Sequence, residues 1–373
     1  MKKKQLIVGL VVLAALVVLV VWCRDRIHFD FREFRSQLAL ANWYRIAAAA
    51  ACIYVGYIFR SVRWALLLRH NKKVSVFSLL GTQVIGFTAV ALIGRIADPV
   101  RPYLVAKKTG LTLSNQIAVY IVERLFDFGS MALIFSLAML WIPDAEVLKA
   151  TGHSRIFTVW MHSSPVGPAM IARYGGLVIT LLAALFLAAV RLASSIVASI
   201  VERSFGIFSK NLGRAAAHKV RAFHAGLDTI RSLSDFAITA GLSLAMWTLI
   251  MMAYLETVTA FTASRELASI TVPECVLLMT ASGGASIFQL PIIGWFSQIG
   301  IVAAVLSAFF HAAWEPALAC AATILLVTFL DIIPVGLVWA QFEHISLRRI
   351  AVESEHASEE IADEEHTVPE TEG

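Results

Sequence analysis

Six charged residues between positions 94 and 127 are the side chains of this sequence best suited to chemistry. They are Arg95, Asp98, Arg101, Glu123, Arg124 and Asp127. A guanidinium group binds a phosphate through two parallel hydrogen bonds. A carboxylate can take up a proton or pair with such an arginine. These residue types therefore favour a binding site for an anionic substrate.

The first three of these residues stand beside two prolines. Arg95, Asp98 and Arg101 have the spacing of one helical face, but Pro99 and Pro102 break a helix and leave backbone groups free. We predict that this segment belongs to the substrate site. The alternative is that its arginines are cytoplasmic anchors, because Lys and Arg are enriched on that side of a membrane.

The other three residues follow about one helical segment later. Glu123 and Asp127 are four residues apart and share a helix face, while Arg124 is three before Asp127 and can reach it. One interpretation is an internally neutralised cluster that holds helices together. The other is that a carboxylate here takes up a proton, or pairs with the arginine that holds the substrate.

Motifs for other chemistry are absent from the sequence. It contains no GxxxxGK[ST] phosphate loop, no GxSxG, no HExxH and no CxxC. Its four cysteines lie far apart, and its ten histidines do not have metal-ligand spacing. We therefore expect no enzymatic activity, no cofactor, no metal and no nucleic-acid partner.

The composition indicates that these charges lie in a membrane. Hydrophobic residues make up 58% of the chain and charged residues 15%, and apolar runs of about 18 residues recur. The sequence predicts an all-α, polytopic membrane protein with about 6 to 8 transmembrane helices. An ionised side chain at bilayer depth costs about 2.5–3.5 kcal/mol, so it normally faces a partner or a wet cavity.

Charge is distributed unevenly along the chain. Residues 353–373 hold nine acidic residues and no Lys or Arg, which leaves a net charge of +14 on residues 1–352. The tail is too polar to bury a core, so we expect it to be disordered.

The apolar runs divide the chain into three regions. We predict a first helix and an external loop (1–42), a membrane body (43–352) and the acidic tail (353–373). Further expected spans are 43–59, 115–141, 174–190, 236–261 and 316–341, with an amphipathic cytoplasmic connector at 191–235. Arg60, Arg63, Arg69, Lys72 and Lys73 follow the span 43–59 and suggest a cytoplasmic end there. The positive-inside rule also predicts that both termini lie in the cytoplasm and that the protein is in the inner membrane.

The segment 76–93 is apolar but has basic residues on both flanks. A full crossing would put one flank outside, so we predict a re-entrant pair of half-helices that lines a cavity. Residues 43–141 and 236–341 both read as a span, a broken segment and a span, with opposite starting sides. This order predicts an inverted-topology repeat.

The pattern GR-x-x-D-P-x-R-P-x-L, followed by V-E-R-L-F-D, resembles the lysylphosphatidylglycerol synthase transmembrane-domain family of flippase-like membrane proteins. The resemblance implies re-entrant elements and an anionic lipid substrate, and it assigns Arg101, Glu123, Arg124 and Asp127 to the site. A second family landmark, a Pro- and Gly-rich segment ending in Glu, is represented here by Pro291, Gly294 and Gln298. Gln298 replaces the acid, which puts a carboxylate role there in doubt. We expect the soluble aminoacyl-transferase domain of some relatives to be absent.

Together these observations predict a flippase-like transporter of an anionic phospholipid or lipid-linked phosphate. One alternative is a membrane enzyme acting on a lipid-linked sugar. The acids and histidines available to it are Asp144, Glu146, His153 and His162. The other alternative is a scaffold subunit of a lipid or cell-envelope biosynthesis complex. Coupling to a proton or sodium gradient and assembly into a homo-oligomer are left open.

Overall fold

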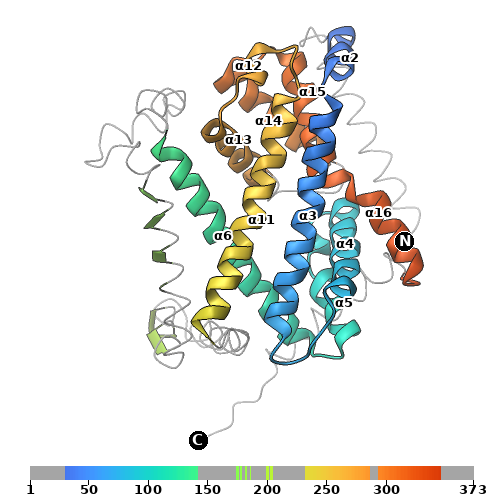
Figure 1. The fold of residues 1–373 in the computed structure, drawn as a ribbon, viewed down its shortest axis with the longest axis vertical. Helices are drawn as coiled ribbons and strands as arrows, with labels where there is room; N and C mark the ends of the chain where they lie inside the picture. Colours follow the sequence, from blue (N-terminus) through green and yellow to red (C-terminus); the bar gives the residue numbers. More distant parts are fainter. Residues whose placement is uncertain are drawn as a thin grey trace, which may run out of the picture.

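The computed structural model describes residues 30–141, 232–285 and 293–345, together with scattered residues between 174 and 204. These residues form eleven α-helices (Figure 1). The first half contains α2 (Phe31–Leu40), α3 (Trp43–Leu68), α4 (Val76–Ile93), the 3-10 turn η1 (Arg95–Ala97), α5 (Val100–Thr109) and α6 (Leu113–Leu140). The second half contains α11 (Leu233–Thr259), α12 (Arg265–Ala268), α13 (Val272–Ala285), α14 (Ile293–Phe310), α15 (Trp314–Leu325), the π-helical turn η3 (Leu326–Leu330) and α16 (Ile332–Phe342).

Four helical segments in the described part of the chain are long and apolar enough to cross a membrane. They are α3, α4, α11 and the continuous segment Trp314–Phe342, which joins α15, η3 and α16. The fifth long helix, α6, has 28 residues but carries the charged residues of the predicted site. Its length of about 42 Å exceeds the roughly 30 Å of a bilayer core.

Polar side chains begin the long helices. Asn42 accepts hydrogen bonds from the backbone at the start of α3, and Thr112 and Ser232 do the same for α6 and α11. Such caps satisfy amide groups that have no partner within the helix. The helix α3 continues to Leu68, nine residues beyond the predicted end at residue 59.

The helices α3 and α11 pack side by side in opposite directions (Figure 1). At one end the Asn42 amide donates to the Ala260 carbonyl at 2.8 Å. At the other end Arg69 pairs with Asp235. This antiparallel pair joins the two halves of the sequence into one body.

The segment after α3 forms a helical hairpin whose turn begins at Gly94. The prediction of two half-helices within residues 76–93 is wrong, because α4 is a single helix that ends at Gly94, where φ is 92°. The chain reverses over residues 94–99, and α5 returns along α4. Lys72 before α4 therefore donates to the Thr109 carbonyl at the end of α5, at 2.6 Å.

A second hairpin is formed by α13 and α14, which pack together. The Gln298 amide near the start of α14 donates to Ser282 near the end of α13 at 3.1 Å. Gly283 and Gly284 lie inside α13, which continues to Ala285. The turn 286–292, with Pro291, lies outside the described residues.

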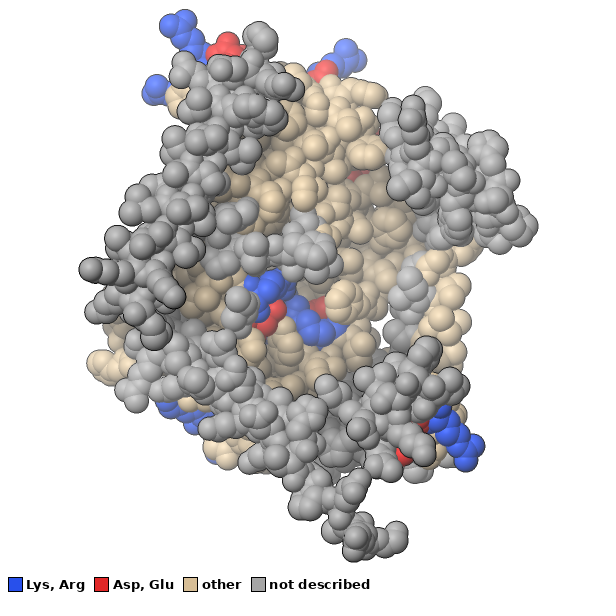
Figure 2. All heavy atoms as spheres, turned by 180° about the vertical axis from the view of Figure 1, so that it is seen from behind, with Lys and Arg blue, Asp and Glu red and all other residues tan. Residues whose placement is uncertain are grey.

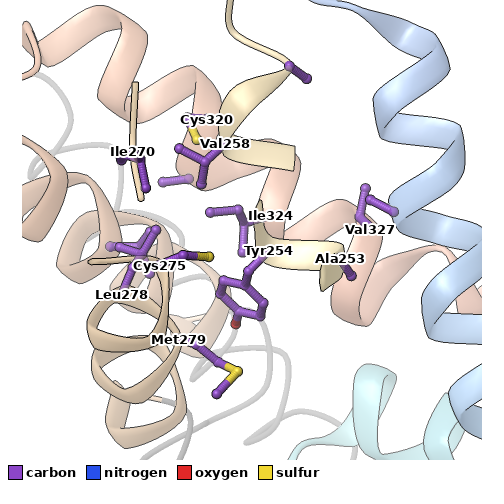
Figure 3. Close-up of a cluster of buried hydrophobic side chains, with 14 of the residues drawn as sticks. Ala253, Tyr254, Val258, Ile270, Cys275, Leu278, Met279, Cys320, Ile324 and Val327 are labelled. Atoms are coloured by element: carbon purple, nitrogen blue, oxygen red, sulfur yellow. The ribbon is translucent and has the colours of Figure 1, made fainter. Parts of the chain in front are cut away.

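The main apolar core fills the space between α11, α13 and α15 (Figure 3). Tyr254 of α11 lies between Met279 of α13 and Ile324 of α15, and all three are buried. Elsewhere α16 packs on α4 and α6 packs on α13, so each half contacts the hairpin of the other.

Several predicted elements lie wholly or mostly outside the described residues: the first helix, the span 174–190, the connector 191–235 and the tail 353–373. The predicted external loop 24–42 contains α2, which packs on α15.

Candidate functional site

Three helices bring six charged side chains together in the first half of the protein. The cluster consists of Arg60 and Arg63 from α3, Arg101 from α5, and Glu123, Arg124 and Asp127 from α6. The hairpin positions Arg101, because α5 packs against both α4 and α6.

Arg101 is fully buried at the centre of the cluster. Its Nη2 atom donates to both Glu123 carboxylate oxygens, at 2.9 and 3.0 Å, and its Nε atom donates to Gln83 of α4 at 2.9 Å. A side chain at Gly86 would collide with the Arg101 side chain. The glycine therefore allows α5 to approach α4 closely enough for these bonds.

The two arginines of α3 hold the α6 carboxylates from the opposite side. Arg63 donates to Asp127 and to Glu123, each at 2.7 Å, and also to Ser243 of α11 at 2.5 Å. Arg60 lies 3.3 Å from Glu123 and 3.6 Å from Asp127. Glu123 is thus shared by three guanidinium groups.

Aromatic rings enclose the buried guanidinium groups. The Arg101 guanidinium lies 4.4 Å from the Phe87 ring centre, 5.3 Å from that of Trp64 and 5.5 Å from that of Tyr120. Arg60 lies 4.8 Å from the same Phe87 ring. The electron-rich faces of these rings stabilise cations that have lost their water.

The cluster becomes more exposed toward the turn η1. Arg95 and Asp98 form a pair at 3.7 Å with 40% and 25% of their side chains exposed. Arg124 is 3.6 Å from Asp127, as their spacing predicted, and 27% of its side chain is exposed. Figure 2 shows basic and acidic side chains meeting in a hollow near the centre of one face.

The cluster lies near the middle of its longest helix. Asp127 is the fifteenth of the 28 residues of α6, which places it about 20 Å from either end. If α6 crosses the bilayer, these charges lie in its apolar interior, where each unpaired charge is costly.

The charges do not cancel. Four guanidinium groups face two carboxylates, so the cluster carries two excess positive charges. Several buried donors have no hydrogen-bond partner within the described structure, among them Arg101 Nη1 and Gln83 Nε2, whereas one carboxylate oxygen, Asp127 Oδ2, lacks a hydrogen bond. Excess donors and excess positive charge are the features of a site for an anion.

The structure separates some residues that the sequence grouped. Arg95 and Asp98 pair with each other at the turn, while Arg101 points into the cluster from α5. The expectation that Pro102 breaks the helix is wrong: it lies in the first turn of α5, where its missing amide is not needed.

The second predicted landmark is not part of this cluster. Gly294 and Gln298 are buried on α14, and Gln298 bonds to Ser282 of α13, which also accepts from Tyr254. Pro291 lies outside the described residues, as do the four acids and histidines considered for an enzyme.

Sequence reasoning missed Arg60, Arg63 and Gln83. The two arginines were interpreted as cytoplasmic residues beyond the end of a span, but they are buried inside α3. The apolar stretch from Trp64 to Leu68 was the available signal, because it extends the helix past both arginines.

The fold and this cluster define an all-helical, multi-pass integral membrane protein with a buried cationic site. Residues 6–338 match the family described as the lysylphosphatidylglycerol synthase TM region, and the chain belongs to this family. No curated protein and no solved structure shows a significant match to the chain.

Proposed function

We propose that this protein is a flippase-like transporter that moves an anionic phospholipid or lipid-linked phosphate across the inner membrane. The observation that carries the proposal is the cluster on α3, α5 and α6, which has two excess positive charges and buried donors with no partner among the described residues. The barrier to lipid movement is desolvation of the headgroup. A buried guanidinium cluster supplies new partners for the phosphate, so no covalent step is needed.

The partly exposed side chains give the headgroup a route of entry. Arg95 and Arg124 are accessible at the η1 turn, and Arg101 lies deeper. A phosphate would first pair with the outer arginines and then compete with Glu123 for Arg101. The acyl chains would stay in the bilayer.

The arrangement of helices supports an inverted repeat of residues 43–141 and 236–341. Each half has a long first helix, a hairpin and a long last segment, and the two first helices pack antiparallel. The last segment of each half packs on the hairpin of the other half. In transporters with such repeats, the substrate site lies at mid-membrane between the halves.

The basic residues around the α4–α5 hairpin also support an orientation of the protein in the membrane. Arg69, Lys72, Lys73, Lys107 and Lys108 gather at the end where α3 and α5 finish and α4 begins. By the positive-inside rule, we place this end in the cytoplasm.

Reconstituted vesicles test the proposed transport. Vesicles containing phosphatidylglycerol labelled with a dithionite-sensitive fluorophore would be treated with dithionite, which bleaches only the outer leaflet. The protein should raise the bleached fraction above that of protein-free vesicles and of vesicles containing Arg101→Lys. A matched phosphatidylcholine probe tests headgroup selectivity. Bleaching equal to that of protein-free vesicles for every anionic probe would reject the proposal.

A further inference from the structure

A second ionisable group lies inside the last membrane segment. Asp331 lies 17 residues after Trp314 and 11 before Phe342 in a continuous apolar segment. It ends the π-helical turn η3, and its amide donates to the Leu326 carbonyl at 2.9 Å, five residues back. Single π-helical turns inside α-helices frequently occur at functional sites.

The Asp331 carboxyl group has no charge partner among the residues that the structure describes. Both of its oxygens are buried, and no side chain of a described residue donates a hydrogen bond to them. No Lys, Arg or His in the described ranges forms an ion pair with it. Asp127, the other central acid, is held by three arginines.

The surroundings of Asp331 are neutral on the helices packed against it. On α3, the Tyr54 hydroxyl donates to the Asp331 backbone carbonyl at 3.1 Å, and Tyr57 lies within electrostatic reach. On α4, Thr88 donates to the next carbonyl, that of Ile332, at 3.2 Å. The titratable group of α11 near η3 is Tyr254, whose hydroxyl donates to Ser282.

An ionised carboxylate in such a place would have no cation among the described residues to stabilise it. The neutral acid avoids most of that cost. We propose that Asp331 is a proton-binding site that couples lipid movement to protonation. The carboxylate takes a proton from water on one side of the membrane and releases it to water on the other. This role rests on the proposed transport function.

Contacts through α4 connect Asp331 to the cationic cluster. Tyr57 packs on Phe87, with ring centres 5.2 Å apart, and Phe87 lies under Arg101 at 4.4 Å. The next residue, Thr88, contacts α16, where a side chain at Gly336 would collide with it. Ionisation of Asp331 would therefore disturb the α4–α16 contact beside the headgroup site.

The protonation of Asp331 can be tested without measuring transport. Dicyclohexylcarbodiimide adds to protonated carboxyl groups in apolar surroundings, and mass spectrometry of the digested protein locates the adduct. We expect Asp331 to be labelled near neutral pH, with labelling lost as pH rises. Glu123 and Asp127, which arginines hold ionised, should not be labelled. An unlabelled Asp331 at every pH at which the protein stays folded would overturn the proposal.

The coupling role is tested with Asp331→Asn, which keeps the shape and removes the proton. In reconstituted vesicles we expect lipid movement to lose its dependence on pH or on a proton gradient. The matched control is Glu274→Gln, a partly exposed acid at the start of α13, which should keep the wild-type pH profile. An unchanged pH profile in Asp331→Asn would overturn the inference, whereas inactive wild-type protein would reject the transport function instead. If Asp331→Asn does not fold, the labelling experiment decides whether Asp331 binds a proton.

Discussion

At the scale of single residues, the site depends on how many guanidinium groups share each carboxylate. Glu123 is bound by Arg60, Arg63 and Arg101, and the cluster as a whole has two excess positive charges. An anchor that only sets topology would lie in water at a helix end. Arg101 is instead fully buried in a ring of aromatic side chains.

Arg101→Lys tests whether the geometry of the guanidinium matters. Lysine keeps the charge but lacks the planar guanidinium, whose Nε donates to Gln83 and whose Nη2 donates to Glu123. A lost charge-assisted hydrogen bond costs about 1.5–3 kcal/mol, so we expect lipid movement in vesicles to fall roughly tenfold or more.

The control for Arg101→Lys is Arg45→Lys, which alters a half-exposed ion pair with Glu256 at the other end of α3. It should move lipid at the wild-type rate. Equal rates for both variants, with wild-type expression, would show that Arg101 is an anchor.

Glu123→Gln separates a structural carboxylate from a coupling one. Three arginines lose their shared partner, and breaking a buried ion pair costs about 3–5 kcal/mol. We expect a clearly lower midpoint of thermal unfolding in detergent, with the remaining transport still dependent on pH. Loss of the pH dependence with unchanged stability would move the coupling role from Asp331 to Glu123.

At the scale of elements, the α4–α5 hairpin brings the cluster together. It depends on close helix contacts at glycines: a side chain at Gly86 would collide with Arg101, and one at Gly81 would collide with Trp339 of α16. The helix α4 is therefore held between α5 on one side and α16 on the other. A change in either contact would alter the packing around both Arg101 and Asp331.

Gly86→Ala should separate α5 from α4. The added methyl group collides with a fully buried side chain, so we expect a lower unfolding midpoint and loss of most transport. Gly241→Ala on α11 is the matched control, because its methyl group meets no atom within 4 Å. There alanine should stabilise the helix by about 0.5–1 kcal/mol. Similar unfolding midpoints for the two variants would contradict the close packing.

At the scale of the whole molecule, the two halves pack through the antiparallel pair α3 and α11. The first hairpin begins and ends near the end of this pair where Arg69 contacts Asp235. Arg45 and Glu256 mark the opposite end. A carrier of this kind would expose its site to one side of the membrane and then to the other by moving one half, with its hairpin, against the other half.

Cysteine labelling can show on which side of the membrane each end of the α3–α11 pair lies. In a variant without its four native cysteines, we expect cysteines at 72 and 107 to react from the cytoplasm and a cysteine at 45 from outside. The first two share a side because Lys72 contacts the end of α5. Labelling of 72 and 107 from opposite sides would contradict the hairpin, and labelling of both from outside would reverse the orientation.

The sequence by itself determined the class of this protein and the general position of its site. Apolar runs longer than a buried soluble helix require a membrane, and charges within them require partners. The bounds of α6 and α11 agree with the predicted spans within about three residues because hydropathy and caps specify helix ends. The contact between Arg124 and Asp127 follows from helical spacing alone.

Only the tertiary structure decided which residues complete the cluster. Arg60 and Arg63 precede Glu123 by about 60 residues, and contacts between separate helices are not encoded by local spacing. Gly86 and Gly81 of α4 allow close contacts with Arg101 and with Trp339, and these contacts between separate helices cannot be predicted from local sequence. Asp331 lies inside the predicted span 316–341, but the sequence does not show whether it has a partner. Its importance follows from the absence of a described partner around its buried oxygens, which depends on the packing of α3, α4 and α16.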